Sequence, residues 1–143
     1  MNKKLFYLLS FTWGLPMSLI GSIVFLVLMI AGHKPKKFNY VYYIEVGNNW
    51  GGLNFGCFFI TSKNPSLHTK QHECGHGIQN CIFGVLFPFI VTIPSAIRYW
   101  YRKLRYHRKG KNPKTKYDDI WFEGQATRLG EKYFNYDNRN SNN

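Results

Sequence analysis

Five consecutive residues, His72-Glu73-Cys74-Gly75-His76, follow the pattern H-E-x-x-H. On a helix, His72 and His76 lie one turn apart on the same face, so both imidazoles can bind one Zn²⁺. Glu73 would then act as the general base that takes a proton from a zinc-bound water. The pattern therefore indicates metal-assisted hydrolysis. The alternative is a helix with two surface histidines and no metal.

A catalytic zinc needs a third protein ligand and one open coordination position. Residues 121–130 are predicted to form a helix in which one carboxylate, Glu123, shares a stripe with small residues. These small residues are Ala126, Thr127 and Gly130. Small residues allow this helix to approach the motif helix closely, so we expect Glu123 to reach the metal. Asp118 or Asp119 would cap the start of the helix. The alternative is a surface glutamate on an amphipathic helix.

The motif belongs to a longer series of residues. The series consists of His72-Glu-Cys-Gly-His-Gly-Ile-Gln79, Phe83-Gly84, Ile93-Pro94-Ser95 and Trp121-Phe-Glu-Gly-Gln-Ala126. It resembles small uncharacterised bacterial proteins of the zincin type, with a glutamate third ligand as in gluzincins. The resemblance implies a metallopeptidase-like site with two histidines and Glu123 as ligands and Glu73 as base, and it names no substrate. Typical gluzincins have a larger domain with a substrate-binding edge strand, for which this chain leaves little room.

Other polar residues are candidates for supporting roles. Gln79, one turn beyond His76, would orient a metal ligand or a catalytic residue without binding the metal itself. The candidates to stabilise the oxyanion are His107, Tyr117, Arg128 and Tyr133, and the sequence does not select among them. His68 lies one turn before His72. We exclude it as a ligand, because successive turns rise about 5.4 Å and three ligands from one straight helix are too far apart for one ion.

The composition limits the class of protein. A chain of 143 residues has room for one domain with appendages. Its 19 lysines and arginines exceed its 7 acidic residues, which gives a net charge of +12. The cysteines, Cys57, Cys74 and Cys81, form an odd set without C-x-x-C spacing, so no disulfide framework and no cysteine-type zinc site are predicted. A cysteine inside the motif suits a reducing compartment.

Residues 11–31 contain no charged side chain. About 20 apolar residues span a bilayer, so this run is long enough for a transmembrane helix. A signal peptide is the alternative, because Lys3 and Lys4 give a basic start, but no small-residue cleavage site follows the run. We therefore expect residues 1–34 to form an uncleaved single-pass membrane anchor. The distribution of lysine and arginine places the catalytic domain on the cytoplasmic side.

A second apolar stretch, residues 78–97, directly continues the motif helix. A buried helix and a membrane-embedded segment explain this stretch equally well. Residues 98–116 follow with nine lysines and arginines, several aromatic residues and no acidic residue. Such a mixture can bind nucleic acid, but because it follows an apolar segment we expect it to contact anionic lipid headgroups.

The remaining segments predict an α+β fold after the N-terminal transmembrane helix. Residues 38–46 and 53–61 are rich in β-branched and aromatic residues, so we expect two strands that form a short hairpin beside the metal-binding helices. A basic linker, residues 32–38, precedes them. The zincin-like domain then extends from residue 35 to 134, and the asparagine-rich tail, residues 135–143, is expected to be disordered.

These observations predict a membrane-associated zinc metallopeptidase. The two motif histidines and Glu123 would hold Zn²⁺, and Glu73 would activate the water that attacks a peptide bond. Two other classes of protein remain open. One is a non-catalytic membrane protein with a structural or vestigial zinc site, in which His68 or Cys74 would supply a fourth ligand. The other is a basic nucleic-acid-binding protein.

Overall fold

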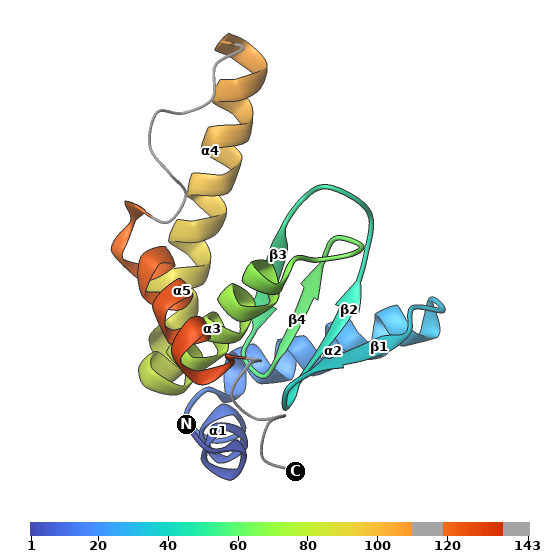
Figure 1. Ribbon diagram of the computed structural model, residues 1–143, viewed down its shortest axis with the longest axis vertical. Helices are drawn as coiled ribbons and strands as arrows, with labels where there is room; N and C mark the ends of the chain where they lie inside the picture. The colour runs from blue at the N-terminus through green and yellow to red at the C-terminus, as the bar shows by residue number, and fades with distance from the viewer. Residues whose placement is uncertain (110–118, 136–143) are drawn as a thin grey trace.

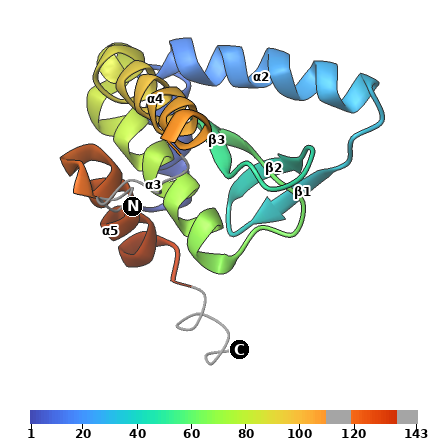
Figure 2. The same cartoon turned by 90° about the horizontal axis from the view of Figure 1, so that it is seen from above.

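The computed structural model describes residues 1–109 and 119–135 and has an α+β architecture (Figure 1). Helix α3 (Leu67–Phe83) lies in the middle of the molecule. The sheet covers one side of α3, and helix α5 (Trp121–Tyr133) packs along another side (Figure 2). Helix α2 (Leu15–Ile30) crosses the opposite face of the sheet. The motif helix is therefore held between the sheet and α5.

Four strands form one mixed sheet in the order β1-β2-β4-β3. The strands are β1 (Pro35–Phe38), β2 (Val41–Glu45), β3 (Gly52–Phe55) and β4 (Phe58–Thr61). The pairs β1–β2 and β3–β4 are antiparallel, whereas β2 and β4 run parallel. Strand β3 therefore forms one edge of the sheet, and it packs against α3.

The predicted hairpin between residues 38–46 and 53–61 is wrong, because the strands from these two segments run parallel. Each segment contains a tight turn: Asn39 has a φ of 56° between β1 and β2, and Gly56 has a φ of 69° between β3 and β4. Asparagine and glycine adopt this left-handed conformation more readily than other residues. Two separate hairpins result, and the basic linker predicted at residues 32–38 supplies β1.

The side chains of β4 alternate between the two faces of the sheet. Phe59 is fully buried and packs in one cluster with Cys74 and Ile78 of α3. Phe58 lies next to it along the strand, and its ring centre is 4.7 Å from that of Phe25 in α2. The sheet is therefore covered by α3 on one face and by α2 on the other.

The N-terminal helix α1 (Lys3–Ser10) is part of the folded core. Phe6 belongs to the same buried cluster as α3 and the sheet, and none of its surface is exposed. The Asn80 side chain of α3 donates a hydrogen bond to the Gly14 carbonyl at 3.2 Å. A Cβ at Gly14 would overlap that side chain, so the turn between α1 and α2 fits closely on the motif helix.

The predicted continuous helix over residues 11–31 is not formed. The chain turns after α1, and α2 starts at Leu15 with Pro16 in its first turn, where the missing backbone N–H of proline costs nothing. Among the residues described, no single helix has the length and apolar composition to cross a bilayer. Two bent pairs of helices meet these criteria only together: α1 with α2, at 93°, and Leu67–Leu86 with Pro88–His107, at 115°.

The apolar stretch at residues 78–97 is a bent segment rather than one helix. After α3, the chain continues through the short turns η1 (Gly84–Leu86) and η2 (Pro88–Thr92) into α4 (Ile93–Lys109). Phe87 and Val91 are buried in this bend. The ring of Phe87 lies 6.4 Å from that of His76, so the bend brings the start of α4 beside the motif.

Replacing Phe6 by alanine should lower the free energy of unfolding by about 3–5 kcal/mol, the usual loss for a buried phenylalanine. Leu8→Ala is the matched control, because Leu8 lies on the same helix and is 60% exposed. Its effect should stay within about 0.5 kcal/mol. Denaturation of both variants, followed by circular dichroism, measures the difference. Equal effects would show that α1 is not packed on α3.

Candidate metal centre

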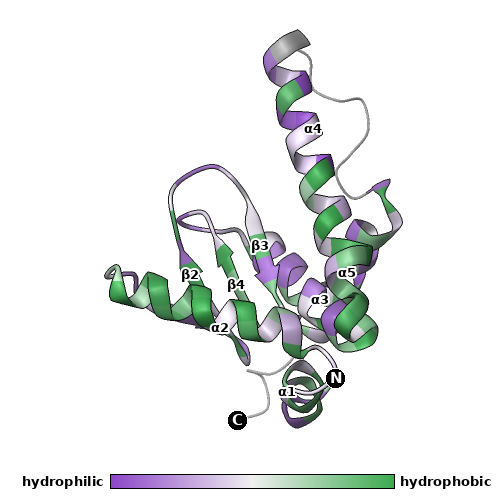
Figure 3. Ribbon diagram, turned by 180° about the vertical axis from the view of Figure 1, so that it is seen from behind, coloured by the Kyte–Doolittle hydropathy of each residue, from purple (hydrophilic) through white to green (hydrophobic). Residues whose placement is uncertain are grey.

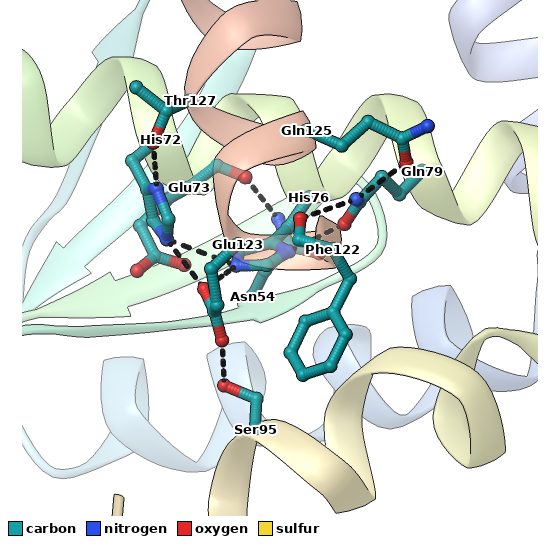
Figure 4. Close-up of polar contacts among 10 residues, drawn as sticks. All are labelled: Asn54, His72, Glu73, His76, Gln79, Ser95, Phe122, Glu123, Gln125 and Thr127. Atoms are coloured by element: carbon teal, nitrogen blue, oxygen red, sulfur yellow. Dashed lines mark hydrogen bonds and ion pairs between the residues drawn. The ribbon is translucent and has the colours of Figure 1, made fainter. Parts of the chain in front are cut away.

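The motif histidines project from one face of α3 (Figure 4). The helix begins at Leu67, because the Ser66 hydroxyl accepts a hydrogen bond from the Thr69 backbone N–H at 3.0 Å and caps the first turn. His72 and His76, one turn apart, place their Nε2 atoms 3.1 Å from each other. Both side chains are buried, so the pair is not a surface feature.

The Glu123 carboxylate completes a triangle with the two histidines (Figure 4). Its Oε2 atom lies 3.1 Å from His72 Nε2 and 3.2 Å from His76 Nε2. Ligand atoms about 2.0–2.1 Å from a tetrahedral zinc lie about 3.3 Å apart, so this triangle matches one face of such a tetrahedron. The three buried side chains lie close enough together to bind one metal ion, as predicted.

Close packing between α3 and α5 brings Glu123 to this position. A Cβ at Gly75 would overlap the backbone carbonyl of Ala126, and a Cβ at Gly130 would overlap that of Gln71. Ala126 and Gly130 are themselves buried. The predicted contact between the motif helix and a stripe of small residues is therefore confirmed.

The Nδ1 atom of each histidine has a polar partner that orients the ring. His76 Nδ1 lies 2.8 Å from Gln79 Oε1. The Gln79 amide nitrogen donates to the Phe122 carbonyl at 2.8 Å, so its oxygen must be the acceptor for His76. His72 Nδ1 lies 2.9 Å from the Thr127 hydroxyl oxygen. When a metal takes the centre of the triangle, Nδ1–H of each ring can donate to these partners while Nε2 binds the metal, which is the usual arrangement of a metal-binding histidine.

Thr127→Val should weaken zinc binding about 10- to 100-fold, the usual cost of losing the partner of a ligating histidine. Valine keeps the shape of threonine but cannot accept the hydrogen bond from His72. Thr127→Ser keeps the hydroxyl and should bind zinc nearly as the natural protein does. Competition with a zinc-binding dye measures the affinities. An equal loss in both variants would show that packing, not the hydrogen bond, is responsible.

Ser95, near the start of α4, supports the third ligand. Its hydroxyl donates a hydrogen bond to Glu123 Oε1, which leaves Oε2 for a metal. Burial alone would raise the pKa of Glu123, but hydrogen bonds to His72, His76 and Ser95 hold that pKa below its usual value. The carboxyl group is therefore ionised, which is the form that binds a cation. The sequence showed Ser95 only as part of a resemblance and gave it no role.

Glu73 lies beside the triangle without being part of it (Figure 4). Its backbone carbonyl accepts a hydrogen bond from the Asn54 side chain at 2.8 Å, which ties this turn of α3 to β3. A Cβ at Gly52 would overlap the Glu73 carboxylate, so the strand approaches the side chain closely. Burial raises the pKa of Glu73 to about 7. Its Oε2 atom is buried and makes no hydrogen bond within the described residues, so it is available to a proton donor.

A cavity of about 400 Å³ borders the two histidines and Glu73. Gly52 and Leu53 of β3 form part of one wall, and Tyr99 of α4 forms part of another. Because β3 is the edge strand, one side of its backbone has no partner strand in the sheet that residues 1–109 build. The chain thus has room for an edge strand, contrary to expectation, and this strand borders the cavity.

The three predicted oxyanion candidates that the structure describes do not line this cavity. His107 is exposed toward the far end of α4, and Arg128 is exposed on α5. Tyr133 packs against the buried cluster around Phe59, and Tyr117 lies outside the described residues. Tyr99, which the sequence did not single out, lines the cavity instead.

Helix α5 begins at Trp121, as predicted, but its N-cap residue is Ile120 and not one of the two aspartates. The apolar Ile120 side chain makes no capping hydrogen bond. Asp118 lies outside the described residues. Residues 110–116 of the predicted basic stretch and residues 136–143 of the predicted tail also lie there.

No protein-family model, curated protein or solved structure matches the chain. The resemblance to zincin-type proteins therefore stays a prediction that rests on the motif residues. What the structure adds is the convergence of His72, His76 and Glu123 at one candidate metal centre.

Proposed function

We propose that this protein is a zinc-dependent peptide hydrolase. One observation carries the proposal: the ligand atoms of His72, His76 and Glu123 lie 3.1–3.2 Å from one another at the wall of a cavity. Beside them lies the Glu73 carboxylate, whose Oε2 atom has no hydrogen-bond partner among the residues that the structure describes. A structural zinc site would surround the ion with four protein ligands. Within the part of the chain that the structure describes, only these three side chains form such a group.

Two imidazoles and one carboxylate form a ligand set that suits zinc, and three protein ligands leave one coordination position open for catalysis. A bound Zn²⁺ would supply a Lewis acid that lowers the pKa of a water molecule and polarises a substrate carbonyl. Cys74, the other candidate ligand in the motif, is fully buried in the cluster between α3 and the sheet. It is not a member of the metal-binding group.

Glu73 moves the proton in this mechanism. Its carboxylate takes a proton from the water while the water oxygen attacks the peptide carbonyl carbon. When the carbon–nitrogen bond breaks, the same carboxyl group delivers that proton to the leaving amine. The products are a new carboxyl group and a new amine, and Glu73 returns to its ionised form.

The edge strand β3 provides a way to bind a peptide. An extended peptide can pair with the free backbone groups of an edge strand, and these hydrogen bonds do not depend on the peptide sequence. Strand β3 also contacts Glu73 at two points, because the Asn54 side chain donates to the Glu73 carbonyl and Gly52 lies against the Glu73 carboxylate. We infer that a peptide paired with β3 would present its carbonyl to Glu73 and the metal.

The test is cleavage of a mixed peptide library by the purified full chain loaded with zinc, with the products identified by mass spectrometry. A chelator should abolish cleavage, and added Zn²⁺ should restore it. A protein that binds zinc in full and cleaves no peptide would contradict the proposal and favour a structural site.

A further inference from the structure

Helix α4 carries an exposed apolar stripe. The stripe consists of Ile97, Trp100, Tyr101 and Leu104, which are 64%, 63%, 61% and 53% exposed. Their spacing of three, one and three residues places all four on one face of the helix. Large apolar side chains gathered on one exposed face indicate a surface that contacts a partner.

The opposite face of α4 belongs to the candidate metal centre. Ser95 and Tyr99 lie four residues apart and both line the cavity. At 100° per residue, they lie on the side of the helix that faces away from the apolar stripe. Beyond the cavity, α4 extends away from the rest of the molecule (Figure 1). One helix thus carries the wall of the cavity on one face and the apolar stripe on the other.

Basic residues flank the apolar stripe. Within the described side chains of α4, Arg98 and Arg105 border the stripe on one side and Lys103 on the other, whereas Arg102 lies toward the cavity side. The helix contains no acidic residue. The Lys103 ammonium lies 5.1 Å from the centre of the Trp100 ring, so charge and aromatic surface are close together. An apolar face with tryptophan and tyrosine, bordered by lysine and arginine, is typical of a helix that lies in the headgroup region of an anionic membrane.

Helix α2 adds a second apolar surface to the molecule. Its 16 residues contain no charge, although Ile20, Ile23, Val27 and Ile30 are 46–78% exposed. Seen from behind the sheet, the ribbon of α2 has the colour of hydrophobic residues over most of its length (Figure 3). In water, the outer face of a surface helix is normally polar. The exposed apolar residues of α2 therefore also suit a membrane surface.

We propose that α4 is an interfacial helix that lies along an anionic bilayer surface through Ile97, Trp100, Tyr101 and Leu104, while its opposite face forms a wall of the metal cavity. This interaction goes beyond peptide hydrolysis and does not depend on it. The net charge of +12 favours anionic lipid over a second copy of this chain, which would be repelled. Nucleic acid would explain the basic residues but not the exposed isoleucine and leucine.

The test compares two positions on α4 in the full chain. Leu104→Cys places a fluorescent label on the apolar stripe, and Tyr106→Cys places it two residues away on the opposite face, where Tyr106 is 52% exposed. The natural cysteines are at most 4% exposed, and the natural protein, treated with the same label, gives the background. Vesicles of phosphatidylcholine with phosphatidylserine carry a lipid-attached quencher in the headgroup region.

The label at position 104 should be quenched roughly twofold or more relative to the label at position 106, because an interfacial helix buries its apolar face about 5–10 Å into the headgroup boundary. Vesicles without phosphatidylserine should give less quenching. Equal quenching at both positions would overturn the proposal, since it indicates a helix inserted or exposed on all sides. Absence of quenching at both positions would also overturn the proposal. Self-association of the protein, or binding to single-stranded DNA at the same salt, would then identify the partner instead.

Discussion

Alanine in place of His72, His76 or Glu123 is expected to abolish stoichiometric zinc binding. Each residue supplies one corner of the triangle of ligand atoms, and two protein ligands do not form a stable tetrahedral site. The loss of zinc affinity should exceed the 10- to 100-fold effect that is usual for a residue, such as Thr127, that hydrogen-bonds a ligating histidine. Zinc content of the purified variants and competition with a zinc-binding dye measure the effect.

His68→Ala is the matched control for these variants. His68 lies one turn before His72 on the same helix, and its ring is 6.2 Å from that of His72. It lines the cavity but does not belong to the metal-binding group, so zinc content should stay near one per chain. If Glu123→Ala kept the full affinity, Glu123 would not be the third ligand, and Asp119 would be the next candidate.

Glu73→Gln should lower peptide hydrolysis by at least about 100-fold, the usual contribution of a positioned general base. Glutamine keeps the size of the side chain but cannot accept and return a proton. Because Glu73 is not one of the three converging ligands, zinc content should not change. Initial rates on the best peptide of the library, with zinc content measured on the same samples, separate the two effects.

Glu131→Gln is the control for the charge change. Glu131 is an exposed residue of α5, the helix that also carries Glu123. Because Glu131 does not line the cavity, its replacement removes one negative charge and leaves the cavity unchanged. Its rate should equal that of the natural protein. A Glu73→Gln protein that hydrolyses peptides at the full rate would show that the proposed mechanism is wrong, even if zinc is bound.

Much of the candidate site could be predicted because it depends on local helical spacing. The four-residue spacing of His72 and His76 places both side chains on one face of a helix. The spacing of the small residues after Glu123 likewise places them on one face of the second helix. The contact of Gly75 with Ala126 then follows from the absence of side-chain bulk. Neither inference needs knowledge of the rest of the fold.

The pairing of the strands could not be predicted in the same way. Segments 38–46 and 53–61 have the composition of strands throughout, but single residues with positive φ, Asn39 and Gly56, divide them. The parallel pairing of β2 and β4 depends on contacts between distant residues. The same limit applies to the N-terminal segment. Its charge-free run indicates a continuous helix, whereas the turn between α1 and α2 packs on α3 through the contact between Gly14 and Asn80.

The residues around the metal centre that sequence analysis missed come from elements whose position depends on the whole fold. Ser95 reaches Glu123 only because the chain bends between α3 and α4. Asn54 reaches the Glu73 backbone only because β3 is the strand beside α3. Tyr99 lies one turn after Ser95 on the same face of α4, so the same bend between α3 and α4 brings it to the cavity.

The coordination of zinc in the purified full chain tests the central claim most directly. X-ray absorption at the zinc edge should show one zinc per chain with nitrogen and oxygen ligands at about 2.0–2.2 Å, from two imidazoles, one carboxylate and a water, and no sulfur ligand. A sulfur shell at about 2.3 Å would place a cysteine on the metal and contradict the site formed by His72, His76 and Glu123. Absence of bound zinc after loading with the free ion would contradict it equally.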